Sequence, residues 1–138
     1  MELIGRFKKI NRLLAKEMDK TFTEHDLNHA SFDVLATLRR SGKPYALSPN
    51  ELLATMMITS GTMTNRIDRL VKAGLVKRIP NPNDGRGFII SLTESGFSLI
   101  DKTVTAHVST QTRLTSGLSA KEQQQLNELL CKFLNSIE

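Results

Sequence analysis

The chain has 138 residues, of which 39% are hydrophobic and 24% are charged, and its formal net charge is +5. This length suits a single domain with one core, and no stretch approaches the roughly 20 apolar residues that a membrane-spanning helix needs. Charged residues interrupt the N-terminal segment, which therefore lacks the apolar run of a secretory signal, and we expect a soluble protein of the cytoplasm.

A long amphipathic helix is predicted over about residues 2–22, because apolar residues recur there every three or four positions. Its apolar positions are Leu3, Ile4, Phe7, Ile10, Leu13, Leu14 and Met18. The same kind of pattern predicts a second helix that ends before Gly42. Its apolar positions are Phe32, Val34, Leu35 and Leu38.

Residues 48–74 predict two short helices. The first begins at Ser48, which is followed by Pro49 and Glu51 in the pattern of a capped helix start. The second is capped by Thr59 or Ser60, carries a basic last turn and stops at Gly74. Its inward apolar positions are Met63, Ile67, Leu70 and Val71. Two short helices joined in this way form a candidate helix-turn-helix.

A β-hairpin is predicted next, with strands over residues 75–79 and 88–92 and a long tip of turn-forming residues between them. Thr93 then starts a long helix to about residue 114, and a capping box at Ser119 and Glu122 starts a last one. The expected fold is mainly α with a small β-hairpin wing, in one domain over residues 1–138. Residues 30–93 form its winged helix-turn-helix part, and residues 1–24 and 94–138 form a helical dimerisation part.

The positive charge gathers in the middle of the chain. Residues 39–87 hold nine basic and three acidic residues, a net +6, whereas the rest of the chain carries −1. Such an excess is typical of a surface that meets a polyanion.

The second helix of a helix-turn-helix enters the major groove of DNA, so its outward residues near the N-terminus are candidates for base contacts. Asn pairs bidentately with adenine and Arg with guanine, while Ser, Thr and Met make softer contacts. The candidates are Ser60, Thr62, Met63, Thr64, Asn65, Arg66 and Arg69. A merely solvated helix face would also be polar, but it would not predict the hairpin that follows.

The hairpin tip offers Arg86, between Gly85 and Gly87, to a narrow minor groove, whose negative potential attracts a guanidinium. Asp84 is expected to orient that guanidinium through a charge-assisted pair. At the base of the hairpin, Lys77 and Arg78 are candidate phosphate contacts, which add affinity without sequence information.

These residues give the chain a resemblance to the MarR family of bacterial regulators. The matching segments are residues 48–52, 64–70, 74–76, 84–86 and 92–96, which read SPNEL, TNRIDRL, GLV, DGR and LTESG. One departure is Gly85, where many members carry another basic residue.

The resemblance implies a homodimer in which the first and last two helices of each subunit interlock and hold two winged helices over a pseudo-palindromic site. The sequence agrees independently, because apolar stripes at both ends exceed what a winged helix of roughly 60 residues can bury. These stripes hold Leu3, Ile4, Phe7 and Ile10, and Leu126, Leu130, Phe133 and Ile137.

The resemblance also implies a repressor that is released by a small phenolic or amphipathic ligand or by cysteine oxidation. The candidate ligand-pocket residues are Arg12, Met18, Phe32 and His107. Cys131 is the only cysteine, so no second thiol can resolve a sulfenate, and an inert interface cysteine is favoured over a redox sensor.

Other function classes find less support in the sequence. It holds no phosphate-binding loop and no nucleophile motif, so we do not expect an enzyme. Neither a metal site nor another cofactor is expected, because His25, His29 and His107 show no ligand-like spacing with Cys131 or with carboxylates. A winged helix that binds protein or RNA in place of duplex DNA remains the alternative, although a helix fits the DNA major groove better than the deep, narrow groove of RNA.

Overall fold

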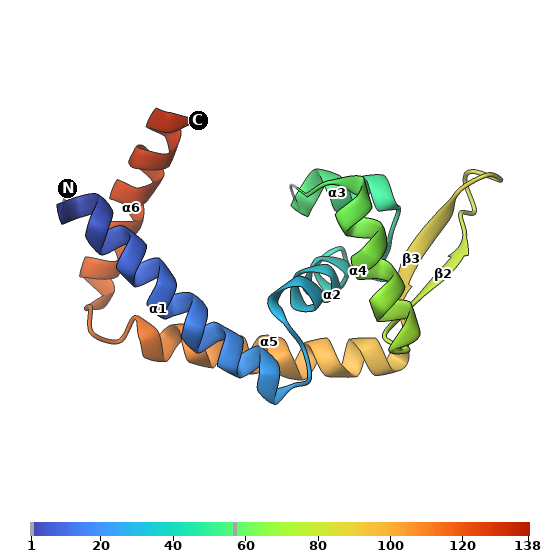
Figure 1. Ribbon diagram of the computed structural model, residues 1–138, viewed down its shortest axis with the longest axis horizontal. Helices are drawn as coiled ribbons and strands as arrows, with labels where there is room; N and C mark the ends of the chain where they lie inside the picture. The colour runs from blue at the N-terminus through green and yellow to red at the C-terminus, as the bar shows by residue number, and fades with distance from the viewer. Residues whose placement is uncertain (1, 57) are drawn as a thin grey trace.

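A computed structural model describes residues 2–56 and 58–138. Within them the helices are α1 (Glu2–Glu24), α2 (His29–Arg40), α3 (Pro49–Met56), α4 (Ser60–Lys72), α5 (Glu94–Leu114) and α6 (Ala120–Ile137). The strands are β1 (Ala46–Leu47), β2 (Val76–Pro80) and β3 (Phe88–Leu92). Figure 1 shows α2, α3, α4 and the strands gathered into one lobe, which we call the winged-helix lobe, with α5 running beneath it. The predicted fold class, a mainly helical winged helix-turn-helix, is confirmed.

The helices begin where the polar caps of the sequence placed them. The side chain of Thr59 accepts a hydrogen bond from the amide of Thr62, and that of Thr93 accepts one from the amide of Gly96. Ser119 and Glu122 form the expected reciprocal capping box at α6. Each cap satisfies an amide that has no partner within its own helix, so these local patterns set the residue at which each helix begins.

The sheet has three antiparallel strands in the order β1-β3-β2, whereas the sequence predicted a two-stranded hairpin. β1 was missed because it is only two residues long. β2 also begins one residue later than predicted. The amide of Leu75 is used to close α4, donating to the carbonyl of Leu70 at 3.0 Å after Gly74 turns the chain at a φ of +75°.

The core of the winged-helix lobe is closed by α5 and by the end of α1. Fully buried side chains from α2, α3, α4 and the sheet meet Ile100 of α5 and Phe22 of α1. The principal ones from the lobe are Val34, Leu35, Leu38, Leu52, Met63, Ile67, Leu70, Val76 and Ile90. The lobe is therefore packed directly onto the long helix that leads to the C-terminal part.

The first turn of α5 packs in close contact with the backbone at the base of the wing. A Cβ atom added to the buried Gly96 would lie 1.9 Å from the carbonyl oxygen of Leu75, so only glycine fits. Beside it, the amide of Thr93 donates to that same oxygen at 3.1 Å, and the Thr93 hydroxyl donates to the carbonyl of Gly74 at 2.7 Å. These contacts fix the two residues that precede β2 relative to α5.

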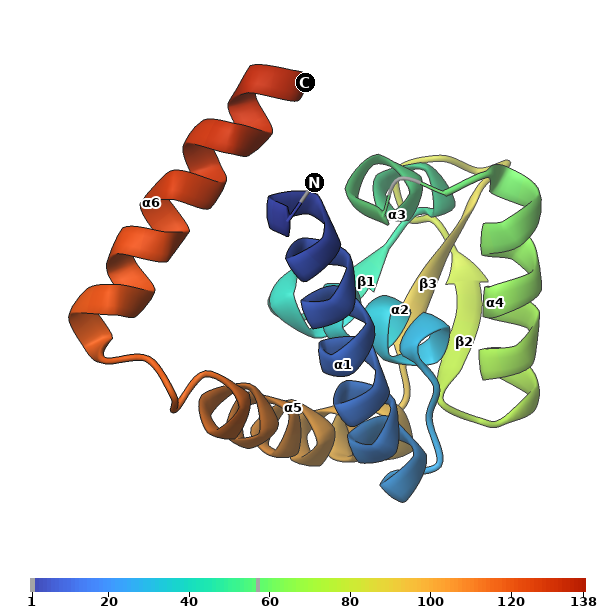
Figure 2. The same ribbon diagram turned by 60° about the vertical axis from the view of Figure 1, so that its left-hand side comes forward.

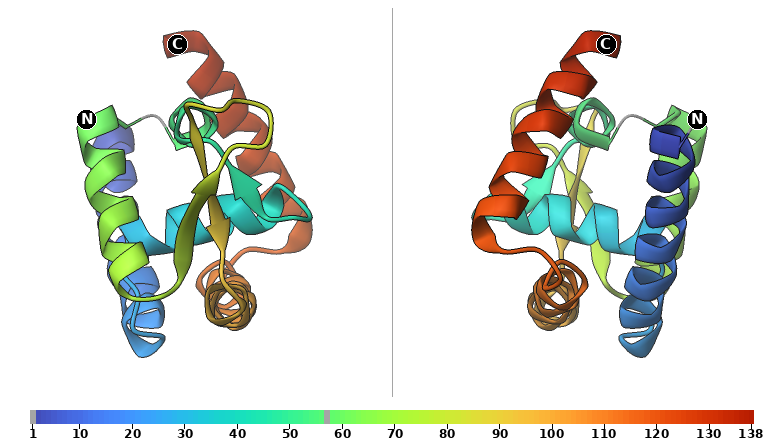
Figure 3. Two further views of the ribbon diagram at one scale, coloured as in Figure 1. Left: turned by 90° about the vertical axis from the view of Figure 1, so that its right-hand side faces the viewer. Right: turned by 90° about the vertical axis from the view of Figure 1, so that its left-hand side faces the viewer.

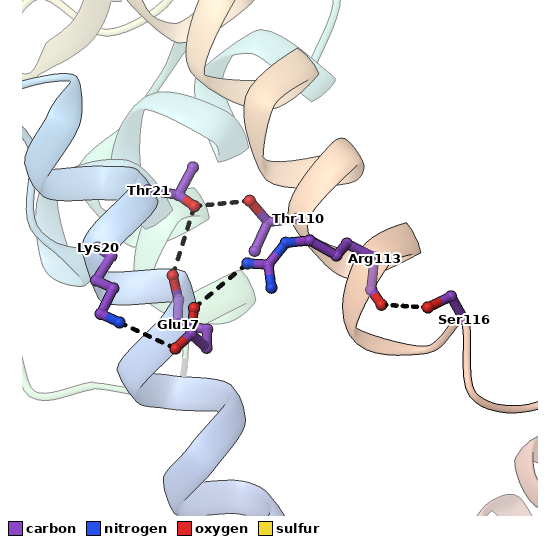
Figure 4. A network of polar contacts seen from close by, with 6 residues as sticks. All are labelled: Glu17, Lys20, Thr21, Thr110, Arg113 and Ser116. Carbon is purple, nitrogen blue, oxygen red and sulfur yellow. Dashed lines mark hydrogen bonds and ion pairs between the residues drawn. The ribbon is translucent and has the colours of Figure 1, made fainter.

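Polar contacts fasten α1 to α5 further along (Figure 4). The hydroxyls of Thr21 and Thr110 share a buried hydrogen bond of 2.7 Å. The Glu17 carboxylate accepts from Lys20 at 3.1 Å and from Arg113 at 3.3 Å. These two hydrogen bonds, with the positive charge of their donors, hold the pKa of Glu17 below its ordinary value.

The α6 helix stands away from the rest of the molecule (Figure 2). It meets α1 near the two chain ends, where the rings of Phe7 and Phe133 lie 6.5 Å apart. Large apolar side chains on both helices remain exposed. They are Leu3, Ile4, Phe7, Ile10 and Leu13 of α1, and Leu126, Leu129, Leu130, Leu134 and Ile137 of α6.

Candidate nucleic-acid interface

The N-terminal end of α4 and the tip of the wing both point away from α5 (Figure 1). Seen along the long axis of the molecule, α4 lies beside β2 and the wing rises next to it (Figure 3). A helix with an adjoining thin wing is the arrangement that places one element in the major groove and the other in the minor groove.

Burial divides the predicted residues of α4 into an inner and an outer set. Asn65 lies opposite the buried stripe of Met63, Ile67 and Leu70, and Arg69 follows it one turn later. Both are exposed, and within the described part of the chain no hydrogen bond or ion pair holds either side chain. They are thus the side chains of α4 that are freest to meet a base.

Met63 is wrongly placed among the DNA-contacting residues. Its side chain is 1% exposed and belongs to the core. The helical periodicity, which placed Met63 on the inward stripe, predicted its position correctly. A buried thioether in this stripe cannot reach a thymine methyl group in the groove.

Three of the four remaining DNA-contact candidates of α4, Thr62, Thr64 and Arg66, are more constrained than Asn65. Ser60, Thr62 and Thr64 are exposed, but the Thr64 hydroxyl donates to the carbonyl of Ser60 at 3.0 Å and the Thr62 hydroxyl accepts from Thr59 at 2.9 Å. Arg66 is half-buried, and its Nε is buried without a partner among the described residues. Arg66 therefore leaves the helix along its flank, whereas Asn65 points outward.

The wing tip is built by two side chains that bond the backbone. The amide oxygen of Asn81 accepts from the amide of Asn83 at 2.9 Å, and the carboxylate of Asp84 accepts from the amide of Arg86 at 3.0 Å. The expected pairing between Asp84 and the guanidinium of Arg86 is absent from the described residues. Asp84 shapes the turn instead, and the exposed guanidinium of Arg86 is left free.

At the base of the wing, Lys77 and Arg78 lie on opposite faces of β2, because successive strand residues alternate. Lys77 is exposed and remains a candidate for phosphate contact. Arg78 is already occupied: its guanidinium forms an ion pair with Asp68 of α4 and lies 5.7 Å from the ring centroid of Phe88. No sequence pattern indicated this pairing, since ten positions and a turn separate Asp68 from Arg78.

The four predicted ligand-pocket residues lie in different places in the described part of the chain. Phe32 and His107 pack with Phe22 in an aromatic cluster, where the ring centroids of Phe22 and Phe32 are 4.4 Å apart. Burial lowers the pKa of His107. Arg12 is exposed on α1, and Met18 lines a hollow between α1 and α5.

Two other features are absent from the described residues. No cluster of three His, Cys, Asp or Glu residues is placed to hold a metal ion. No described helix is both long and apolar enough to cross a membrane.

A three-helix lobe with an exposed polar helix and a cationic wing defines a winged-helix DNA-binding protein. The profile of the MarR family matches residues 25–87. The chain belongs to the MarR family of transcriptional regulators: it is 40% identical over 130 residues to the HTH-type transcriptional regulator PecS of Dickeya dadantii, a match that covers 94% of this chain and 78% of that protein.

Other relatives agree with this assignment. The chain is 30% identical to the multiple antibiotic resistance protein MarR of Escherichia coli, over 91% of this chain and 89% of that one. The crystal structure of a cysteine-to-serine mutant of E. coli MarR, complexed with operator DNA, matches with a TM-score of 0.84 and 30% identity. That match covers 97% of this chain and 94% of the other.

Proposed function

We propose that the chain binds a pseudo-palindromic DNA operator as a homodimer and represses transcription until a small amphipathic ligand releases it. One observation carries the proposal: the exposed cations of α4 and the wing and the exposed apolar side chains of α1 and α6 belong to elements that lie at opposite ends of the molecule (Figure 1). The first suits a polyanion and the second suits another copy of the same chain.

The apolar surface is too large to be left in water. Leu3 is 66% exposed and Ile137 is 70% exposed, and both belong to the apolar faces of α1 and α6. Burying a side chain of this size contributes about 1.5–3 kcal/mol, so covering both faces stabilises an assembly strongly. Twofold pairing buries the same surface on both copies, and it leaves the two winged-helix lobes free.

The same pairing explains how a small lobe achieves specificity. Each lobe offers Asn65 and Arg69 to a major groove and Arg86 to the adjoining minor groove. Two lobes held at a fixed separation must engage two half-sites at once, which raises affinity for correctly spaced sites. The operator complex of the related E. coli protein supports this use of the surface.

For the ligand, we propose the hollow between α1 and α5, which includes Met18 but not the other three residues predicted from the sequence. It is an open depression of about 410 Å³, lined by Leu14, Met18 and Val108 together with Gln111 and Thr112. Apolar walls with a few polar groups suit an amphipathic molecule. Any change in the angle between α1 and α5 would alter the separation of the two lobes and hence the DNA affinity.

The DNA-binding part is tested with a duplex selected from random sequence for tight binding to the wild-type protein. We expect fluorescence anisotropy to show affinity that falls steeply with salt and a large loss in Arg86→Ala. The matched control is Lys102→Ala, which removes one exposed cation from α5, and it should bind like wild type. Equal binding of Arg86→Ala to the selected duplex would contradict the assigned surface.

The homodimer is tested by light scattering after size-exclusion chromatography. We expect Phe7→Glu and Leu130→Glu to yield monomers with weakened operator binding, because each places a charge in the apolar face. Lys8→Glu changes an exposed residue next to Phe7 and should remain dimeric. A monomeric wild type, or dimers in all three variants, would show that these helices do not form the interface.

A further inference from the structure

The recognition helix α4 and the wing are joined by one side-chain cluster that leaves the core. It consists of Asp68 on α4, Arg78 on β2 and Phe88 on β3. We call it the α4–wing clamp. Asp68 pairs with Arg78, whose guanidinium carbon lies 5.7 Å from the centre of the Phe88 ring. The three residues therefore bridge every element that the proposed interface uses.

The strand register shows why these side chains meet. Arg78 is paired with Ile90 of β3, and Phe88 lies two residues before Ile90 on the same strand. Side chains two apart on a strand share a face, so Phe88 is a diagonal neighbour of Arg78 on the face turned towards α4. Ile90 is buried in the core, whereas Phe88, further towards the wing tip on the same face, is partly exposed. There the contact between the wing and α4 is made by the clamp residues.

We propose that Asp68 and Arg78 are positioning residues for specific DNA binding: the clamp sets the angle between α4 and the wing, and neither side chain serves as a DNA ligand. The proposal rests on the proposed function. Asp68 is the acidic residue among the cations Arg66, Arg69 and Lys72 of α4. A carboxylate on a helix that faces DNA repels the phosphates, so its presence needs an explanation. The ion pair with Arg78 supplies one.

Stability alone does not account for the cluster. The Asp68 side chain is 58% exposed and that of Arg78 is 35% exposed. Ion pairs this accessible contribute little to the free energy of folding. The cluster restricts the orientation of α4 relative to the wing. This orientation decides whether the recognition helix and the wing can enter adjacent grooves at the same time.

The first test compares the selected duplex with an unrelated one, using Asp68→Asn and the exchange variant Asp68→Arg/Arg78→Asp. Simple charge repulsion predicts that Asp68→Asn binds all DNA more tightly. The clamp predicts weaker binding to the selected duplex, on the order of tenfold, with unchanged or tighter binding to unrelated DNA. It also predicts that the exchange variant regains specificity. Tighter specific binding by Asp68→Asn, or no recovery in the exchange variant, would overturn the proposal.

The second test uses the dependence of affinity on salt. Losing one phosphate contact lowers the slope of log K against log salt by about 0.9. Arg78→Gln should keep the wild-type slope while losing specific affinity. The matched variant is Lys77→Gln, which removes the exposed cation from the other face of the same strand and should lower the slope. A lowered slope in Arg78→Gln would make Arg78 a phosphate ligand and refute the assignment.

A third measurement needs no DNA, so it separates the clamp from the proposed function. Hydrogen exchange of the free protein should be faster at the amides of Asn81 and Gly87 in Asp68→Asn than in wild type, with the melting temperature nearly unchanged. Wing exchange equal to wild type would overturn the clamp even if DNA binding is intact. If the wild type bound no duplex, the proposed function would be refuted. The comparison of hydrogen exchange between Asp68→Asn and wild type would still show whether the clamp restricts the wing.

Discussion

Among the described glycines, Gly96 is the position where an added methyl group would clash most severely. Replacing it by alanine therefore perturbs the contact between α5 and the base of the wing. The added Cβ would lie 1.9 Å from the carbonyl oxygen of Leu75, whereas real Cβ contacts under 3.0 Å essentially do not occur. The two segments must therefore separate by about 1 Å or more. This movement would stretch the bonds from Thr93 to the carbonyls of Gly74 and Leu75, now 2.7 and 3.1 Å long.

The cost follows from those contacts. Two hydrogen bonds contribute about 1 kcal/mol each, and overpacking a tight site costs about 1–3 kcal/mol. The better helix propensity of alanine returns about 1 kcal/mol. We expect Gly96→Ala to lose roughly 2–4 kcal/mol of the free energy of unfolding, which lowers the melting temperature by roughly 6–16 °C.

The assay is thermal unfolding followed by circular dichroism at a fixed protein concentration, since assembly also affects stability. Gly61→Ala is the matched control, because Gly61 lies in α4 with open space around its Cα. A melting temperature for Gly96→Ala within about 2 °C of wild type would refute the reasoning. Such a result would mean that α5 and the wing can separate at little cost.

Three further predictions concern single side chains. Asp84→Ala should weaken binding to the selected duplex severalfold in anisotropy, while Asp84→Asn should not, because the amide oxygen still accepts from the Arg86 amide; equal losses would restore a charge-pairing role. Burial lowers the pKa of His107 below its ordinary value, so the unfolded chain binds the proton more readily and stability should fall as the pH drops below about 6.5. Urea unfolding at several pH values should show a smaller fall in His107→Phe, and an identical fall would assign it to other groups. Thr110→Val removes the buried partner of the Thr21 hydroxyl and should cost about 1–2 kcal/mol in urea unfolding; an unchanged midpoint would show that water replaces the bond.

Local chemistry made much of the fold predictable. Ser48, Thr93 and Ser119 indicate helix starts because a cap is satisfied within three residues. The two principal strands were predicted for a similar reason, since a dense run of turn formers separates them. β1 escaped prediction because its two residues owe their pairing entirely to β3, a partner more than forty positions away in the sequence.

The candidate interface was predictable in its location and less so in its details. Helical periodicity places Asn65 outward and Met63 inward, so the error at Met63 came from weighing residue chemistry above position. No local pattern could show that Arg78 is engaged by Asp68 and Phe88, whereas the bond from Asp84 to the amide two residues further on is a turn pattern that the sequence does offer. The contacts of Arg78 depend on how β2 crosses α4, which is a tertiary fact.

The long helix α5 connects the parts on which the proposed regulation depends. Its N-terminal end abuts the base of the wing at Gly96, and its middle is tied to α2 by the bond from Arg39 to Asp101 at 2.8 Å. Its far end is tied to α1 through Thr110 and Arg113. A ligand that pushed α1 away from α5, as proposed, would therefore act on the helix that carries the wing. Because the contact at Gly96 has no slack, a displacement of α5 there must move the wing with it, and this coupling joins the hollow to the DNA-facing surface.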